Sequence, residues 1–180
     1  EDMEKKIKEN NIHVCVFCSP HNPSGRVWEK EELEKAMAIF EKHHVYVVSD
    51  EIWSDLIRPG YKHIPTQLVS EYARMHTIAQ YATTKTFNLA GLIGSYHIVY
   101  SKYLRDRIDK EGSLSHYNDI NVFSQHALIG AYKPEGHEWV DELNQVLASN
   151  IDTMKAFLEG YGFKMTLPQG TYLLYVDATD

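Results

Sequence analysis

Short apolar runs that alternate with amphipathic stretches most strongly limit what this chain can fold into. His13–Ser19, Val45–Ser49 and Thr77–Ala82 have the length and the β-branched or aromatic content of strands. Glu29–His44 repeats apolar residues at helical spacing, which predicts an amphipathic helix between the first two strands. Strands that alternate with helices predict a largely parallel sheet covered on both faces. We therefore expect an α/β fold with three layers, helix on sheet on helix.

The rest of the chain continues this alternation. We expect a short helix over Pro65–Arg74, a strand over Ser95–Tyr100, helices over Lys102–Lys110, Asn121–Tyr132 and His137–Tyr161, and strands over Phe163–Thr166 and Tyr172–Val176. The last helix is long enough to bridge two domains. The predicted division assigns residues 1–145 to a large domain that lacks its N-terminal part. Residues 146–180 would hold the end of the bridging helix and the start of a small C-terminal domain.

Composition argues against several classes of partner. The 180 residues carry a net charge of −7 with a pI near 5.8, which argues against nucleic acid or an anionic membrane as the main partner. No apolar run approaches the roughly 20 residues of a membrane-spanning helix. The chain begins with a helix-like segment that has no start signal, and it stops just after a strand-like run. We therefore expect it to be an excerpt of a longer protein.

Each of the three predicted parallel strands is followed by a polar motif. Asn22-Pro23-Ser24-Gly25 follows the first strand, Asp50-Glu51-Ile52-Trp53 the second, and Thr83-Thr84-Lys85-Thr86 the third. Open α/β sheets bind their ligands at this end of the strands. A lysine can form a Schiff base with an aldehyde cofactor, a carboxylate can pair with a pyridinium nitrogen, and an asparagine amide can donate to a phenolate oxygen. The ordered set predicts pyridoxal 5′-phosphate as the cofactor.

Each residue of the set has an expected role. Lys85 would hold the cofactor aldehyde and then act as the general base or acid at the substrate Cα. Asp50 would keep the ring nitrogen protonated, and Asn22 would donate to the ring oxygen. The Thr84 hydroxyl suits a phosphate oxygen, and Trp53 could cover the ring or shape the substrate pocket. Taken singly, these motifs also read as a turn, a helix cap and an exposed lysine.

Cysteine and histidine usage points away from metal chemistry. Cys15 and Cys18 have the C-x-x-C spacing of zinc and redox sites, but no second ligand pair accompanies them. Within a strand, positions three apart face opposite sides, so the two sulfurs should diverge. Two free cysteines in a strand fit a reducing, cytoplasmic location. The ten histidines are scattered, and we predict no metal site.

The ordered motifs resemble those of fold-type I pyridoxal phosphate enzymes in the class I/II aminotransferase superfamily. The intervals of 28 residues from Asn22 to Asp50 and 35 from Asp50 to Lys85 match that family, and the resemblance spans nearly all 180 residues. It implies the three roles given above. It also implies a small domain that opens at Pro168–Leu173, and a homodimer whose subunits share active-site residues.

Within the superfamily, the segments around Asp50 and Lys85 are more similar to the cystathionine β-lyase, or C–S lyase, branch. Many aminotransferases have tyrosine where Trp53 stands, serine in place of Ala82 and arginine in place of Ile93. The resemblance implies β-elimination from cystathionine- or cysteine-type L-amino acids, which yields a thiol, pyruvate and ammonia. An aminotransferase that uses the same residues is the first alternative. A non-catalytic homologue or interaction module is the second, although such a protein needs none of the three residues.

Overall fold

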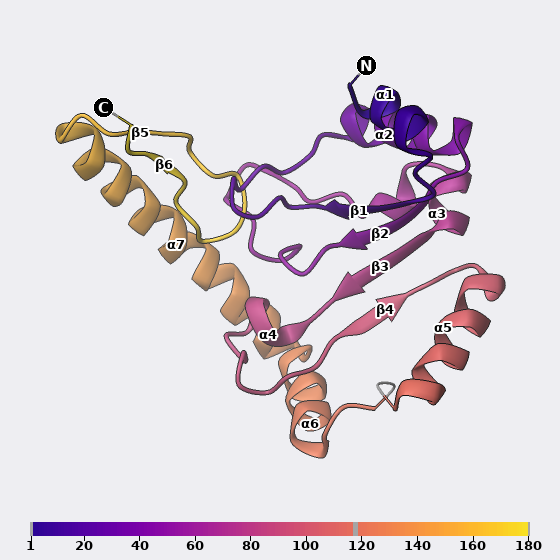
Figure 1. The fold of residues 1–180 in the computed structure, drawn as a ribbon. Coiled ribbons are helices and arrows are strands. Elements are labelled where there is room, and N and C mark those ends of the chain that lie inside the picture. Colours follow the sequence, from indigo (N-terminus) through magenta and orange to yellow (C-terminus); the bar gives the residue numbers. More distant parts are fainter. Residues whose placement is uncertain (1, 117–118, 180) are drawn as a thin grey trace.

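The computed structural model describes residues 2–116 and 119–179, and its centre is a four-stranded sheet (Figure 1). The strands are β1 (Val14–Cys18), β2 (Tyr46–Asp50), β3 (Thr77–Tyr81) and β4 (Tyr96–Ile98), in that spatial order. β1, β2 and β3 are parallel, whereas β4 runs antiparallel to β3. The predicted α/β fold with a mostly parallel sheet is confirmed.

Helices follow the strands almost as the sequence predicts. They are α1 (Asp2–Asn10), α2 (Lys30–Lys42), the 3-10 turn η1 (Thr66–Leu68), α3 (Glu71–His76), α4 (Thr83–Thr86), α5 (Lys102–Ser115), α6 (Val122–Ala131) and α7 (Pro134–Gly160). A two-stranded antiparallel pair, β5 (Lys164–Met165) and β6 (Val176–Asp177), follows α7. None of the described helices combines the length and apolar character needed to cross a membrane.

The main core lies between the sheet and the helices α1, α2 and α3, which gather at one end of the sheet (Figure 1). Its buried members are Ile7, Met37, Phe40, Val45, Val47 and Ala73. Helix α2 buries its predicted apolar stripe there, and a capping box between Glu29 and Glu32 satisfies free N–H groups at its start. This core fixes β1 and β2, whose carboxyl ends carry the first two polar motifs.

The helix predicted over Pro65–Arg74 is broken into η1 and α3. Ser70 has an extended backbone, and its Oγ accepts a hydrogen bond from the Ala73 N–H at 3.0 Å. A serine N-cap of this kind starts a new helix instead of continuing the old one. The predicted single helix is therefore wrong at Ser70.

The strand predicted over Tyr172–Val176 is also shorter than expected. Thr171 has a φ of +67°, and its Oγ1 accepts a hydrogen bond from the Leu173 N–H at 3.2 Å. This local bond competes with ladder pairing, so that only Val176 and Asp177 pair with β5.

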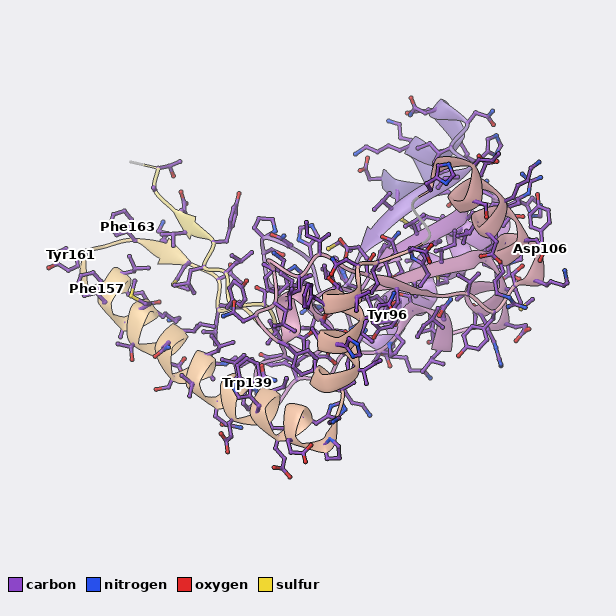
Figure 2. All side chains as sticks on the ribbon, turned by 90° about the horizontal axis from the view of Figure 1, so that it is seen from below. Tyr96, Asp106, Trp139, Phe157, Tyr161 and Phe163 are labelled. Atoms are coloured by element: carbon purple, nitrogen blue, oxygen red, sulfur yellow. The ribbon has the colours of Figure 1, made fainter. Side chains whose placement is uncertain are left out.

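Helix α7 is attached to the loop after β2 by polar contacts. Arg58 donates to both carboxylate oxygens of Asp152, at 2.8 and 2.7 Å, and the Asn144 amide donates to the Asp55 carbonyl at 2.9 Å. The far end of α7, which carries Phe157 and is followed by Tyr161, projects away from the sheet toward β5 and β6 (Figure 2). The predicted division between residues 145 and 146 falls inside this continuous helix.

Candidate active site

The three residues singled out in the sequence lie at the carboxyl edge of the parallel strands. Asp50 is the last residue of β2, and its Cα pairs with Cys18 in β1 and Gln80 in β3. Asn22 follows four residues after Cys18, and Lys85 lies in α4, five residues after Gln80. The structure thus gathers the predicted motifs at one edge, where α/β sheets bind ligands.

The Cys18 thiol lies between the first two of these segments, since Cys18 pairs with Asp50 across the sheet and its Sγ donates a hydrogen bond to the Pro20 carbonyl at 3.2 Å. Burial raises the pKa of Cys18, a hydrogen bond from the backbone N–H of Asn22 acts to lower it, and the negative charge of Asp50 raises it further. The thiol therefore lies beside both Asn22 and Asp50. Both cysteines are free, and each is half-buried.

Asp50 ends a strand and starts no helix. Its Oδ1 accepts a hydrogen bond from the Ile52 N–H at 3.2 Å, and a turn occupies residues 52–55. An aspartate that bonds two residues ahead in this way forms a local Asx turn. Reading Asp50 as a helix cap is therefore wrong. The turn directs the chain so that Trp53 is buried near the edge of the sheet, with 3% of its surface exposed.

Lys85 and Trp53 come together from separate turns. The Lys85 Nζ lies 5.6 Å from the centroid of the Trp53 ring, within the range of a cation–π contact. The Thr86 hydroxyl donates to Asp55 Oδ2 at 2.9 Å, which ties α4 to the turn that holds Trp53. Thr84 lies on the same single-turn helix and is half-buried. The Lys85 amine and the Trp53 ring, which the sequence places 32 residues apart, are thus neighbours in the structure.

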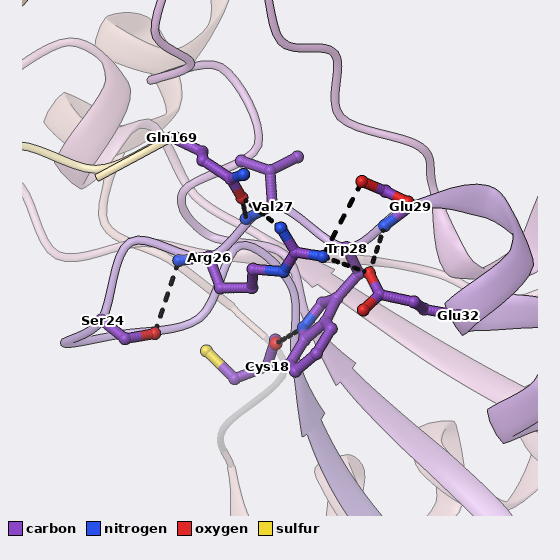
Figure 3. Close-up of polar contacts among 8 residues, drawn as sticks. All are labelled: Cys18, Ser24, Arg26, Val27, Trp28, Glu29, Glu32 and Gln169. Atoms are coloured by element: carbon purple, nitrogen blue, oxygen red, sulfur yellow. Dashed lines mark hydrogen bonds and ion pairs between the residues drawn. The ribbon is translucent and has the colours of Figure 1, made fainter. Parts of the chain in front are cut away.

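The turn that carries Asn22 is held by residues that the sequence did not single out (Figure 3). Gln169 Oε1 accepts hydrogen bonds from the Arg26 guanidinium at 3.1 Å and the Val27 N–H at 2.9 Å. Arg26 also pairs with Glu32 at 2.8 Å. Gln169 is more than 140 residues from its partners along the chain, so no local pattern reveals the contact.

Among residues 2–116 and 119–179, no group of three or more His, Cys, Asp or Glu side chains could hold a metal ion. The polar groups at the sheet edge are an amine, a carboxylate and an amide, which is a set suited to an organic ligand.

A model of the family "Aminotransferase class I and II" matches residues 1–180. The chain belongs to this family. It is 36% identical over 179 residues to cystathionine beta-lyase PatB of Bacillus subtilis (strain 168). This match covers 98% of the chain and 46% of PatB. It is also 30% identical to an aspartate aminotransferase of Bacillus sp. (strain YM-2), in a match that covers 100% of the chain and 45% of that enzyme.

Solved structures agree with the fold. Cystalysin from Treponema denticola, which contains a pyridoxal 5′-phosphate cofactor, superposes with a TM-score of 0.92 at 37% identity. The match covers 98% of this chain and 45% of cystalysin. The fold is that of fold-type I pyridoxal phosphate enzymes. The chain spans about half the length of the relatives it matches.

Proposed function

We propose that this chain forms part of a pyridoxal 5′-phosphate-dependent C–S lyase. The observation that carries the proposal is the gathering of Asn22, Asp50 and Lys85 at one edge of three parallel strands, with Trp53 beside the lysine amine. These side chains fit the cofactor, because they supply an amine for its aldehyde, an acceptor for its ring N–H and a donor for its ring oxygen. Cystathionine beta-lyase and cystalysin among the relatives support the same choice.

The residues of the chain divide the work of β-elimination. When bound, the cofactor would supply a ring that accepts electrons from the substrate. The Lys85 amine takes the proton from the substrate Cα. Asp50 keeps the ring nitrogen protonated through its negative charge, and the Asn22 amide donates to the ring oxygen. The Thr84 hydroxyl binds a phosphate oxygen, and Trp53 covers one side of the site.

The bond that breaks in the lyase reaction joins Cβ to sulfur. The electron pair from the Cα–H bond forms the Cα–Cβ double bond, and sulfur leaves with the Cβ–S pair as a thiolate. The thiol of cysteine has a pKa of about 8.5, so the thiolate leaves without a strong acid. Hydrolysis of the remaining three-carbon fragment consumes water and gives pyruvate and ammonia.

This proposal is tested by adding L-cystathionine to the intact protein in the presence of pyridoxal phosphate and without a keto acid. We expect pyruvate, ammonia and thiol to form in equal amounts. Lys85→Ala should reduce the rate at least about 10²-fold, because it removes the general base. Lys102→Ala is the matched control, since Lys102 is an exposed lysine in α5 paired with Asp106. Pyruvate formation that is unaffected by Lys85→Ala would refute the role of the lysine.

The second candidate is an aminotransferase, favoured by the 30% identity to an aspartate aminotransferase. The same residues would then hold the cofactor, and the Lys85 amine would move a proton without any loss of sulfur from the substrate. Turnover that requires an added keto acid and releases no pyruvate from cystathionine would establish this activity. If the protein binds no pyridoxal phosphate, the remaining interpretation is a non-catalytic homologue or interaction module.

The proposal includes a homodimer in the cytoplasm and the division of the chain at residues 145 and 146. Two free cysteines suit a reducing compartment. Phe123 and Ile93 are 77% and 78% exposed, and apolar side chains with such exposure favour contact with further protein surface. Sedimentation of the intact protein tests the assembly, and a monomer at micromolar concentration would contradict it. We expect residues 1–180 alone to bind the cofactor weakly and to turn over substrate far more slowly than the intact protein.

A further inference from the structure

Glu51, the residue after Asp50, is a carboxylate that is fully buried in the structure. Its exposed fraction is 0%. Four donors surround its two oxygens. Oε1 accepts from the Ser49 hydroxyl at 2.9 Å and the Thr66 N–H at 3.1 Å, and Oε2 accepts from His63 Nε2 at 2.8 Å and the Tyr81 hydroxyl at 2.7 Å. A buried charge is tolerated only when it is paired or hydrogen-bonded to this extent.

The donors come from segments that surround the candidate site. Ser49 precedes Asp50 in β2, and Tyr81 is the last residue of β3, four residues before Lys85. The backbone N–H of Glu51 also bonds to the Gln80 carbonyl at 3.0 Å. The carboxylate therefore joins the end of the strand that carries Asp50 to the end of the strand that leads to Lys85.

The charge state of Glu51 fits a residue that accepts hydrogen bonds on both carboxylate oxygens. Burial acts to raise the pKa of Glu51, but the hydrogen bond and charge of His63 and the bonds from Tyr81 and Ser49 outweigh it, so the pKa is lowered. Burial and the negative charge of Glu51 both raise the pKa of Tyr81, which keeps its hydroxyl protonated as a donor. Only an ionised carboxylate offers acceptors to four donors at once. An amide in its place would turn an N–H group toward two of them.

We propose that Glu51 is a positioning residue. Through Tyr81 and His63 it holds the end of β2, which carries Asp50, and the end of β3, which leads to Lys85, at the spacing needed to bind the cofactor between them. This inference rests on the proposed function, because it concerns how firmly the same cofactor is held. Neither Glu51 nor Tyr81 is assigned a contact with the cofactor or the substrate. Their effect is carried by the backbone of β2 and β3, and it should appear in the geometry and affinity of the bound cofactor.

Tyr81→Phe is the principal test, because it removes one hydroxyl and retains the ring that stacks on Tyr96 at 5.5 Å. Tyr72→Phe is the matched control. The Tyr72 hydroxyl is also partly buried and bonds to the Val45 and Phe40 carbonyls at 2.9 and 3.2 Å, in the core near α2. Glu51→Gln is a second variant that removes the charge with little change in shape. If Glu51→Gln does not fold, Tyr81→Phe decides the question alone.

The measurements are the dissociation constant of pyridoxal phosphate for the intact protein and the induced circular dichroism of the cofactor band per bound cofactor. We expect Tyr81→Phe to weaken binding at least about tenfold, as the loss of a hydrogen bond to a charged group predicts. We also expect it to reduce the induced signal. Tyr72→Phe should lower the melting temperature and leave both cofactor measurements unchanged.

The outcomes separate this inference from the proposed function. If the wild-type protein binds pyridoxal phosphate through Lys85 but Tyr81→Phe behaves like Tyr72→Phe, Glu51 has only a structural role and the inference is overturned. If the wild-type protein does not bind the cofactor, the proposed function fails and the inference fails with it. Weaker binding in Tyr81→Phe and Glu51→Gln, with a normal Tyr72→Phe control, supports both.

Discussion

Replacement of Gly25 by alanine should destabilise the turn that carries Asn22 through two separate effects. Gly25 has a φ of +68°, in the left-handed region that favours glycine. Its carbonyl also accepts hydrogen bonds from the Gln169 and Gly170 N–H groups, both at 2.9 Å. A Cβ at this position would overlap the Pro168 side chain and lie 2.7 Å from the Gly170 carbonyl oxygen. The turn and the segment after β5 are too close to admit a methyl group.

The magnitude follows from these two terms. An alanine in the left-handed conformation costs about 1–2 kcal/mol relative to glycine. Overpacking of a close contact costs about 1–3 kcal/mol more. We therefore expect Gly25→Ala to lower the free energy of unfolding by about 2–5 kcal/mol. Gly60→Ala separates the terms, because Gly60 has a φ of +95° and nothing within 4 Å of its Cβ position. It should show only the backbone term, about 1–2 kcal/mol.

Urea unfolding of the wild-type protein and the two variants, followed by far-ultraviolet circular dichroism, measures both values. The pair distinguishes backbone strain from the steric contact with Pro168 and Gly170. If Gly25→Ala and Gly60→Ala differ by less than about 0.5 kcal/mol, the contact between the Asn22 turn and the segment after β5 is not tight. The reasoning from the structure would then be refuted.

Three further predictions follow from caps and titrating groups. Ser70→Ala should lower the free energy of unfolding by about 1 kcal/mol in urea, and Ser101→Ala by less, because the Ser101 cap bond is longer, at 3.4 Å against 3.0 Å. Burial raises the pKa of Tyr72 to about 12, so the stability it contributes is present below its unfolded value of about 10 and should be lost as the pH rises through 12. The melting temperatures of the wild-type protein and the Tyr72→Phe variant should therefore converge as the pH rises over this range. The pKa of Glu51 is lowered in the folded protein, so this carboxylate contributes stability at pH values above its unfolded pKa of about 4.3. That stability should be lost as the pH falls through the folded pKa. Glu51→Gln should lack this acid-dependent loss.

Local patterns predicted the strands and the edge of the sheet at which the three polar motifs lie. The apolar runs before Asn22, Asp50 and Lys85 are consecutive parallel strands, so the three motifs had to meet at one edge. Periodicity is sufficient for this result because the order of motifs along the chain matches the order of strands in the sheet. It failed where a single hydroxyl competes with the backbone, as Ser70 and Thr171 show.

The groups that hold the site could not be predicted in the same way. Glu51 reads as the second residue of a polar motif, and nothing local indicates that Tyr81 and His63 donate to it from 30 and 12 residues away. Gln169 lies beyond α7 and reaches Arg26 and Val27 only because the chain folds back. Such contacts form only when distant segments fold together, and they leave no periodic signal in the sequence.

The three edge segments are supported by different parts of the molecule. The Asn22 turn is held from the segment after β5 through Gln169, the Asp50 strand end through Glu51 and β3, and the Lys85 turn through Thr86 and Asp55. Because Gln169 shares no partner with Glu51 or Tyr81, loss of the Gln169 contacts should leave the Asp50 and Lys85 segments in place. Effects of Gln169→Ala and Tyr81→Phe on cofactor affinity should therefore add, as expected for contacts without common partners. A coupling well above about 0.5 kcal/mol in the double variant would show that the strand ends respond as a single rigid unit.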